Sequence, residues 1–216
     1  MADVSRETPP APPSARTVFG AALPVAEGYA HLLAADGVVR GLIGPREVPR
    51  LWERHLVNCA VLAEAIDEGR RVGDLGSGAG LPGLVLALLR ADLEITLVEP
   101  LLRRTSFLDQ AVTALSLGNV EVVRARAEQL HGRRTFDIVT ARALAPLDRL
   151  LGWAMPLVEP GGALLAMKGA TVAEEVEHAS AAGLLRGYTV SIQQYGADVI
   201  NPPTTALRVE TVRTGR

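Results

Sequence analysis

The sequence predicts an α/β protein built on a mainly parallel β-sheet, and three observations support this prediction. From Arg71 onwards, short apolar runs alternate with helical segments, a βαβα rhythm that is typical of parallel sheets with helices on both faces. A glycine-rich turn at residues 73–83 joins one of these strands to a helix. The last two apolar runs have no helix between them, so we expect an antiparallel pair there, because a parallel pair would need a crossover.

Length and composition fit one globular domain with small extensions. The chain has 216 residues, of which 48% are hydrophobic and 21% are charged. The formal net charge of −2 excludes a wholly basic nucleic-acid binder, although it permits a local basic face.

Cysteine usage and hydropathy predict a protein of a reducing compartment, which we expect to be the cytoplasm. The single cysteine, Cys59, cannot form an internal disulfide, and we expect no metal site. The longest apolar run, residues 84–89, is far shorter than the ~20 residues of a membrane span. The first residues lack the apolar core of a signal peptide, so we expect neither secretion nor a membrane partner.

The N-terminal third is expected to be helical. Residues 1–16 are rich in Pro, Ala and Ser, and we interpret them as a disordered leader. Amphipathic spacing predicts helices at 23–35 and 51–66, so residues 17–69 form a helical cap before the main domain at 70–216.

The main domain is expected to supply seven strands and the helices between them. The turn at 73–83 opens the first of these helices, and Gly118 ends a later one. The predicted strands are 72–75, 95–98, 120–123, 136–140, 163–167, 188–195 and 207–212. The later helices are expected at 101–117, 147–155 and 172–182.

The glycine turn has two interpretations. Gly78, Gly80 and Gly83 form the G-x-G-x-x-G pattern of dinucleotide-binding proteins, and Glu99 follows at the distance of a ribose acceptor. However, Asp74 suits the cationic amino-acid end of S-adenosylmethionine and would repel a pyrophosphate. The terminal antiparallel pair also resembles that of methyltransferases, so we favour S-adenosylmethionine and keep the nucleotide oxidoreductase as an alternative.

A second motif, Asn201-Pro202-Pro203, is similar to a sequence found in amino-group methyltransferases. Here Thr204 replaces the aromatic residue of that sequence, and the triplet lies between the last two strands. We therefore interpret it as a proline-rich loop.

Several segments together resemble one family, the bacterial small-subunit ribosomal RNA guanine-N7 methyltransferases, also called glucose-inhibited division protein B. The matching segments are Arg54-His55-Leu56, the turn from Asp74 to Gly83, residues 97–108, 124–128 and 140–145, and Met167-Lys168-Gly169. The resemblance implies a Rossmann-like class I methyltransferase fold with a seven-stranded sheet, a small helical N-terminal extension and S-adenosylmethionine as cofactor. It also implies small-subunit (16S) ribosomal RNA, or the ribosomal subunit, as the partner. We expect a monomer.

The resemblance also implies the site residues. Those expected to bind the cofactor are Asp74, Gly76, Ser77, Gly78, Gly80, Leu81, Glu99, Ala127, Glu128 and Arg142. Arg142 and Lys168 are the candidate catalytic residues, and Lys168 is notable as the one lysine in a chain that otherwise uses arginine. Residues expected to contact RNA are Arg54, His55, Arg104, Arg124 and Arg126.

The expected chemistry needs positioning more than proton transfer. Guanine N7 carries a free lone pair, so no general base is required, and the sequence offers no convincing acid–base pair. Two other functions stay open on the sequence alone. One is a small-molecule methyltransferase with the same fold, and the other is a nucleotide-binding module without catalysis.

Overall fold

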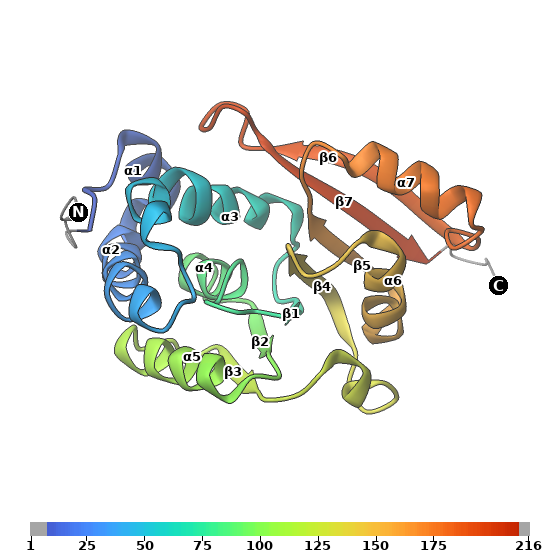
Figure 1. Cartoon of the computed structure of the whole chain (residues 1–216), viewed down its shortest axis with the longest axis horizontal. Helices are drawn as coiled ribbons and strands as arrows, with labels where there is room; N and C mark the ends of the chain where they lie inside the picture. The colour runs from blue at the N-terminus through green and yellow to red at the C-terminus, as the bar shows by residue number, and fades with distance from the viewer. Residues whose placement is uncertain (1–7, 212–216) are drawn as a thin grey trace.

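The structure, a computed structural model, describes residues 8–211, and within them the chain forms one seven-stranded sheet (Figure 1). The strand order is β3-β2-β1-β4-β5-β7-β6. The strands are β1 (Arg71–Leu75), β2 (Glu94–Val98), β3 (Val120–Val123), β4 (Phe136–Arg142), β5 (Val158–Met167), β6 (Tyr188–Tyr195) and β7 (Thr204–Thr211). Strand β7 is antiparallel to both β5 and β6, whereas the other neighbours are parallel. The predicted fold class is therefore confirmed.

Helices cover both faces of the sheet. The N-terminal helical segments are α1 (Pro13–Phe19), η1 (Gly20–Ala22), α2 (Leu23–Leu32), η2 (Leu33–Gly37), η3 (Pro45–Arg50), η4 (Leu51–Val57), α3 (Asn58–Ala60) and η5 (Val61–Ala65). Those of the main domain are α4 (Gly83–Leu89), α5 (Leu102–Ala114), η6 (Ala127–Leu130), α6 (Leu147–Ala154), η7 (Met155–Leu157) and α7 (Val172–Ala181).

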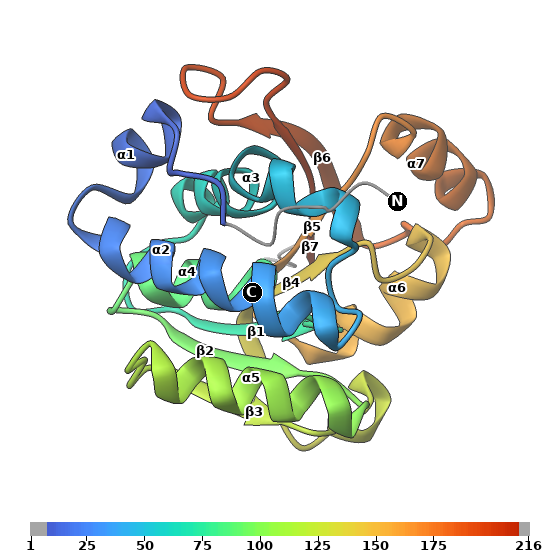
Figure 2. The ribbon, with the colours of Figure 1, turned by 60° about the vertical axis from the view of Figure 1, so that its left-hand side comes forward.

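Two apolar layers enclose the sheet because strand side chains point alternately to its two faces. Ile95 and Leu97 of β2 pack with the N-terminal helices, α4 and α5, and Val98 faces the layer with α6 and α7. Figure 2 shows the blue N-terminal helices on the same side as α4. This arrangement leaves the carboxyl ends of the parallel strands open between the two helical layers, where ligands bind in such sheets.

The structure corrects the boundary of the predicted leader. Helix α1 begins at Pro13, inside the stretch 1–16. Ala11 and Ala15 are buried, so this part of the stretch packs against the rest of the protein. Residues 1–7 lie outside the described residues, as does residue 212 of the last predicted strand. Strand β5 begins at Val158, five residues before its predicted start at residue 163.

Residues Pro13–Gly37 form a helical stretch of 25 residues that is long and apolar enough to cross a membrane by length and composition alone. The sequence does not predict such a stretch, because no uninterrupted apolar run is that long. Core helices of soluble proteins pass the same criterion. Here Ala26, Tyr29, Ala30 and Leu33 are fully buried in the protein core, which accounts for their apolar character.

Candidate active site

The glycine turn follows β1 and leads into α4. Gly76, Gly78 and Gly80 all have a positive φ, which side chains with a Cβ rarely adopt. A Cβ on Gly80 would lie 2.9 Å from the Tyr29 hydroxyl, so packing explains that glycine. A Cβ on Gly78 would meet no atom closer than 3.7 Å. Protein packing therefore does not require a glycine at position 78. The open space beside Gly78 would allow a cofactor to approach the backbone closely.

Asp74 lies beneath this turn with no exposed surface. Its Oδ2 accepts a hydrogen bond from the Gly83 N–H at 3.2 Å, and its Oδ1 accepts one from the Thr140 hydroxyl at 3.0 Å. Burial raises the pKa of Asp74 to about 7, although these hydrogen bonds favour the ionised form. Asp74 thus supports the start of α4 from within the protein and does not present its carboxylate at the surface of the turn.

Ser77 is also buried, and its hydroxyl donates a hydrogen bond to the Asp74 carbonyl at 2.8 Å. Leu81 is 9% exposed and belongs to the same core layer as α4. Both residues therefore shape the turn, and Gly76 and Gly78 are the more accessible members of the set.

Glu99, at the end of β2, turns its carboxylate toward the glycine turn. One oxygen accepts the Gly78 N–H at 3.1 Å, and the other accepts the Leu101 N–H at 3.1 Å. Arg104 from α5 pairs with the same carboxylate at 3.3 Å. The sequence predicts an RNA contact for Arg104. In the structure Arg104 therefore also contacts the carboxylate that faces the glycine turn.

A small cavity of about 150 Å³ opens beside Glu99, at the carboxyl ends of β1, β2 and β3. Its lining includes Gly76, Val98, Ala127, Glu128, Leu144 and Trp153. Ala127 and Glu128 are predicted from sequence to bind the cofactor, whereas Leu144 and Trp153 are not. Helical spacing places Trp153 on α6, but its position beside the segment that follows β3 depends on how the helix crosses the sheet. An apolar slot of this kind suits a flat heterocycle such as adenine.

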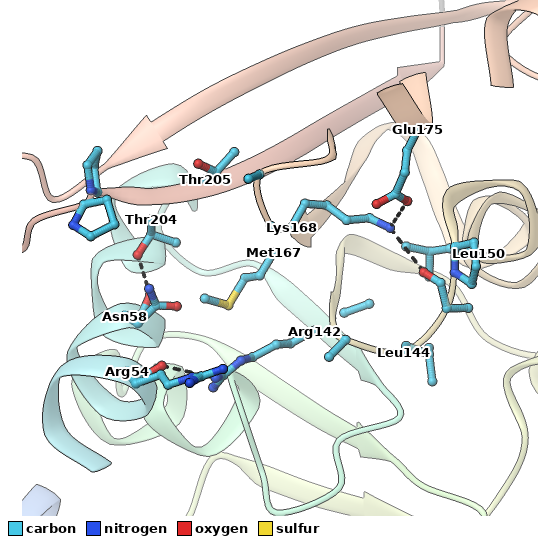
Figure 3. Close-up of a pocket in the computed structure, with 18 residues that line it drawn as sticks. Arg54, Asn58, Arg142, Leu144, Leu150, Met167, Lys168, Glu175, Thr204 and Thr205 are labelled. Atoms are coloured by element: carbon cyan, nitrogen blue, oxygen red, sulfur yellow. Dashed lines mark hydrogen bonds and ion pairs between the residues drawn. The ribbon is translucent and has the colours of Figure 1, made fainter. Parts of the chain in front are cut away.

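A larger cavity of about 940 Å³ lies next to it, between the ends of β4 and β5 (Figure 3). Its wall includes Arg54, Asn58, Arg142, Lys168, Glu175 and the Pro202-Pro203 loop. The segment that we interpreted from sequence as a proline-rich loop therefore lines this cavity. Ala143, directly after Arg142, has a φ of +50°, a strained conformation of the kind that gathers at functional sites.

Arg142 reaches from the end of β4 to the N-terminal helical region. Its guanidinium donates to the His55 Nδ1 at 2.8 Å, the Arg54 carbonyl at 3.1 Å and the Cys59 Sγ at 3.4 Å. His55 also contacts the Glu47 carboxylate through Nε2 at 3.0 Å. Burial and the Arg142 charge lower the pKa of His55 to about 4, so the imidazole is neutral at pH 7.

Lys168, at the end of β5, is held by the protein. Its Nζ donates to the Glu175 carboxylate at 2.7 Å and to the Ala145 carbonyl at 3.2 Å. Figure 3 shows Lys168 pointing toward Glu175. The Leu147 N–H donates to the same oxygen of Glu175 at 3.0 Å. The lysine side chain is only 8% exposed, so it joins β5, α7 and the loop before α6 at the cavity wall. Sequence reasoning singled out Lys168 but missed Glu175.

The remaining arginines expected to contact RNA lie at different distances from the cavities. Arg54 is exposed at the rim of the large cavity, where it pairs with Glu47 at 3.3 Å. Arg126 is exposed and lines the small cavity, and Arg124 is exposed after β3. Arg54 therefore lines the large cavity and Arg126 the small one, while Arg124 lies one residue beyond the end of β3.

The strand order, the antiparallel β7 and the glycine turn with Glu99 together define a class I S-adenosylmethionine-dependent methyltransferase fold. Two solved structures share this fold with the chain. One is a ribosomal protein L11 methylase from Lactobacillus delbrueckii subsp. bulgaricus, with a TM-score of 0.56 and 14% identity over 72% of this chain and 77% of that one. The other is a precorrin-6y C5,15-methyltransferase from Geobacter metallireducens, with a TM-score of 0.53 and 16% identity over 72% and 87%.

The family is more specific than the fold. The model of the rRNA small subunit methyltransferase G family matches residues 23–197. A protein of a Nocardioides species named ribosomal RNA small subunit methyltransferase G is 61% identical over 99% of this chain and 86% of its own length. The protein of the same name from Thermobifida fusca is 57% identical over 91% and 83%. The chain belongs to the rRNA small subunit methyltransferase G family, which confirms the resemblance found in the sequence.

Proposed function

We propose that this protein transfers the methyl group of S-adenosylmethionine to N7 of a guanine in small-subunit (16S) ribosomal RNA. The observation that carries the proposal is the adjacency of two cavities at the ends of β1, β2, β4 and β5. The smaller one lies beside Glu99 and the open cradle at Gly78, and the larger one is lined by Arg142. Membership of a family of ribosomal RNA methyltransferases supports ribosomal RNA as the substrate.

In this proposal the cofactor supplies an electrophilic methyl group, and the residues around it bind and orient. Gly76 and Gly78 admit it to the turn, which Gly80 shapes by packing against Tyr29 and Leu84. Glu99 accepts hydrogen bonds from its ribose hydroxyls in place of the Gly78 N–H. Ala127 and Glu128 hold the adenine in the small cavity. Asp74, Ser77 and Leu81 act from beneath by setting the shape of the turn.

The larger cavity is the place for the guanine. Attack by N7 needs no base, since its lone pair is free, and the catalytic demand is alignment of the nitrogen with the methyl group. The product base gains positive charge, so Arg142 and Lys168 serve best by orienting other groups. Lys168, already paired with Glu175, does this by holding the cavity wall.

RNA is expected to approach along the rim where Arg54, Arg104, Arg124 and Arg126 lie, whereas His55, expected from sequence to contact RNA, is buried behind Arg54. The phosphate contacts of the arginines would supply affinity, whereas the base inserted into the cavity would supply specificity. We propose that the protein acts as a monomer in the cytoplasm, where ribosomal subunits are found, and without a membrane partner.

The decisive experiment maps N7-methylguanine in 16S RNA from cells with and without the gene, and repeats the reaction with purified protein. We expect one methylated guanine to disappear in the deletion and to return when the protein and S-adenosylmethionine are added to RNA or subunits from that strain. Unchanged methylation would overturn the proposal. Methylation of a small molecule without RNA would support the first alternative, and cofactor binding without turnover on any substrate the second.

A further inference from the structure

His55 lies in the middle of a chain of contacts that runs from Glu47 to Arg142. The imidazole Nε2 is 3.0 Å from the Glu47 carboxylate, and Nδ1 is 2.8 Å from the Arg142 guanidinium. Arginine has donors and no acceptor, so Nδ1 must be the unprotonated nitrogen. The proton is then on Nε2, where the Glu47 carboxylate accepts it. The three residues therefore define a single tautomer of His55.

We propose that His55 is a positioning residue that holds the Arg142 guanidinium at the wall of the methyl-transfer cavity, with Glu47 maintaining the tautomer that this requires. The inference rests on the proposed function and assigns His55 a role within it.

The contacts of Arg142 support this assignment. All three of its acceptors come from one stretch of the N-terminal helical region: the Arg54 carbonyl, the His55 Nδ1 and the Cys59 Sγ. The bond to His55 is the shortest, and among the two acceptors that are side chains, nitrogen is a much stronger acceptor than sulfur. The position of a side chain on β4 thus depends on an imidazole that lies 87 residues earlier in the chain.

The same geometry argues against a direct role of His55 in RNA binding. The residue is only 8% exposed, and both ring nitrogens already have partners. An RNA contact would have to break one of these bonds. His55 therefore acts through Arg142, and Arg54, exposed on the same turn, is the group that faces solvent.

Two nearly isosteric variants separate the two bonds. In H55N the amide oxygen occupies the place of Nδ1 and accepts from Arg142, whereas the contact with Glu47 is lost. In H55Q the amide nitrogen occupies the place of Nε2 and donates to Glu47, whereas the acceptor for Arg142 is lost. Each variant loses one hydrogen bond, so thermal unfolding should show similar stability for both.

The measurement is single-turnover methyl transfer to 16S RNA at saturating S-adenosylmethionine, together with RNA affinity. We expect H55Q to react at least about tenfold more slowly than H55N, because misplacement of a positioned group costs rate, while both bind RNA with the wild-type affinity. Equal rates for the two variants would overturn the inference, and so would a loss of RNA affinity in both without a difference in rate.

A second readout does not depend on activity. Nitrogen-15 NMR of the imidazole should show a protonated Nε2 and an unprotonated Nδ1 in the wild-type protein, and the Nδ1 resonance should shift in Arg142→Met. An unchanged Nδ1 resonance would overturn the inference. If the wild-type protein failed to methylate 16S RNA, the proposed function would fall, while the NMR experiment would still decide whether His55 holds Arg142.

Discussion

Gly78 and Gly69 share a backbone conformation and differ in what surrounds them. Their φ values are +57° and +68°, and neither has a packing atom close to the position of a Cβ. Gly78 lies in the cofactor turn, whereas Gly69 precedes β1 at the opposite end of the sheet. We expect Gly78→Val to abolish S-adenosylmethionine binding in calorimetry, and Gly69→Val to bind as the wild type does. Both should lose similar stability, because a β-branched residue is strained at a positive φ. Binding by Gly78→Val would contradict the assignment of the turn.

The raised pKa of Asp74 predicts how the stability of the protein changes with pH. Its pKa is about 7 in the folded protein and about 3.9 in an unfolded chain, so the folded state binds more protons between these values. The stability that Asp74 contributes is present below pH 4 and is lost as the pH rises through 7. Asp74→Asn cannot titrate, and its amide can still contact Gly83 and Thr140.

We therefore expect the free energy of unfolding of the wild type to fall relative to Asp74→Asn by roughly 1–3 kcal/mol between pH 5 and pH 8. Denaturant titrations of both proteins at the two pH values measure this difference. Parallel pH dependence of the two proteins would show that Asp74 is already ionised when buried.

At the scale of elements, helix α2 supports the cofactor turn through one side chain. The Tyr29 hydroxyl donates a buried hydrogen bond of 2.6 Å to the carbonyl of Ala79, which lies between Gly78 and Gly80. Tyr29→Phe leaves that carbonyl buried without a partner, which costs about 1–3 kcal/mol. We expect a lower melting temperature and weaker S-adenosylmethionine binding.

Tyr195→Phe is the matched control for Tyr29→Phe. It removes a hydroxyl on β6 that contacts Gln193, away from the turn. This control should leave cofactor affinity unchanged. If Tyr29→Phe lowered the melting temperature and left cofactor affinity intact, the contact would support the fold alone.

Lys168 joins three elements at the wall of the large cavity. A guanidinium is wider than an ammonium and does not fit the same short contacts to Glu175 and Ala145. We expect Lys168→Arg to keep cofactor affinity and to slow single-turnover methylation at least tenfold, about 1.4 kcal/mol of transition-state stabilisation. Arg149→Lys, an exchange in the opposite direction on the exposed face of α6, should react at the wild-type rate. A wild-type rate for Lys168→Arg would show that only the charge at this position matters.

At the scale of the whole molecule, local patterns in the sequence predicted the elements better than the contacts between them. The sequence predicted β6 at its observed bounds, and the glycine spacing located the cofactor turn. The bonds that complete the site join distant segments, such as Tyr29 to Ala79 and His55 to Arg142. No periodicity reports such pairs, because they depend on how the N-terminal helices pack against the sheet. The cavity wall at Pro202 was missed for the same reason.

The distribution of charge over the molecule predicts which end meets RNA. Arg54 and Arg70 form a matched pair for mutation at the two ends of the sheet. Their side chains are 52% and 45% exposed, and each pairs with one carboxylate. Arg54 lies at the carboxyl end of the sheet beside the large cavity, and Arg70 directly precedes β1 at the amino end. If RNA docks at the carboxyl end, Arg54→Ala should weaken binding and lower the slope of log K against log salt concentration by about 0.7–0.9, the value for one phosphate contact. Arg70→Ala should change neither quantity. Titrations of 16S RNA at several salt concentrations measure both, and an equal effect of the two variants would mean that RNA responds to the overall charge of the protein and has no preferred face.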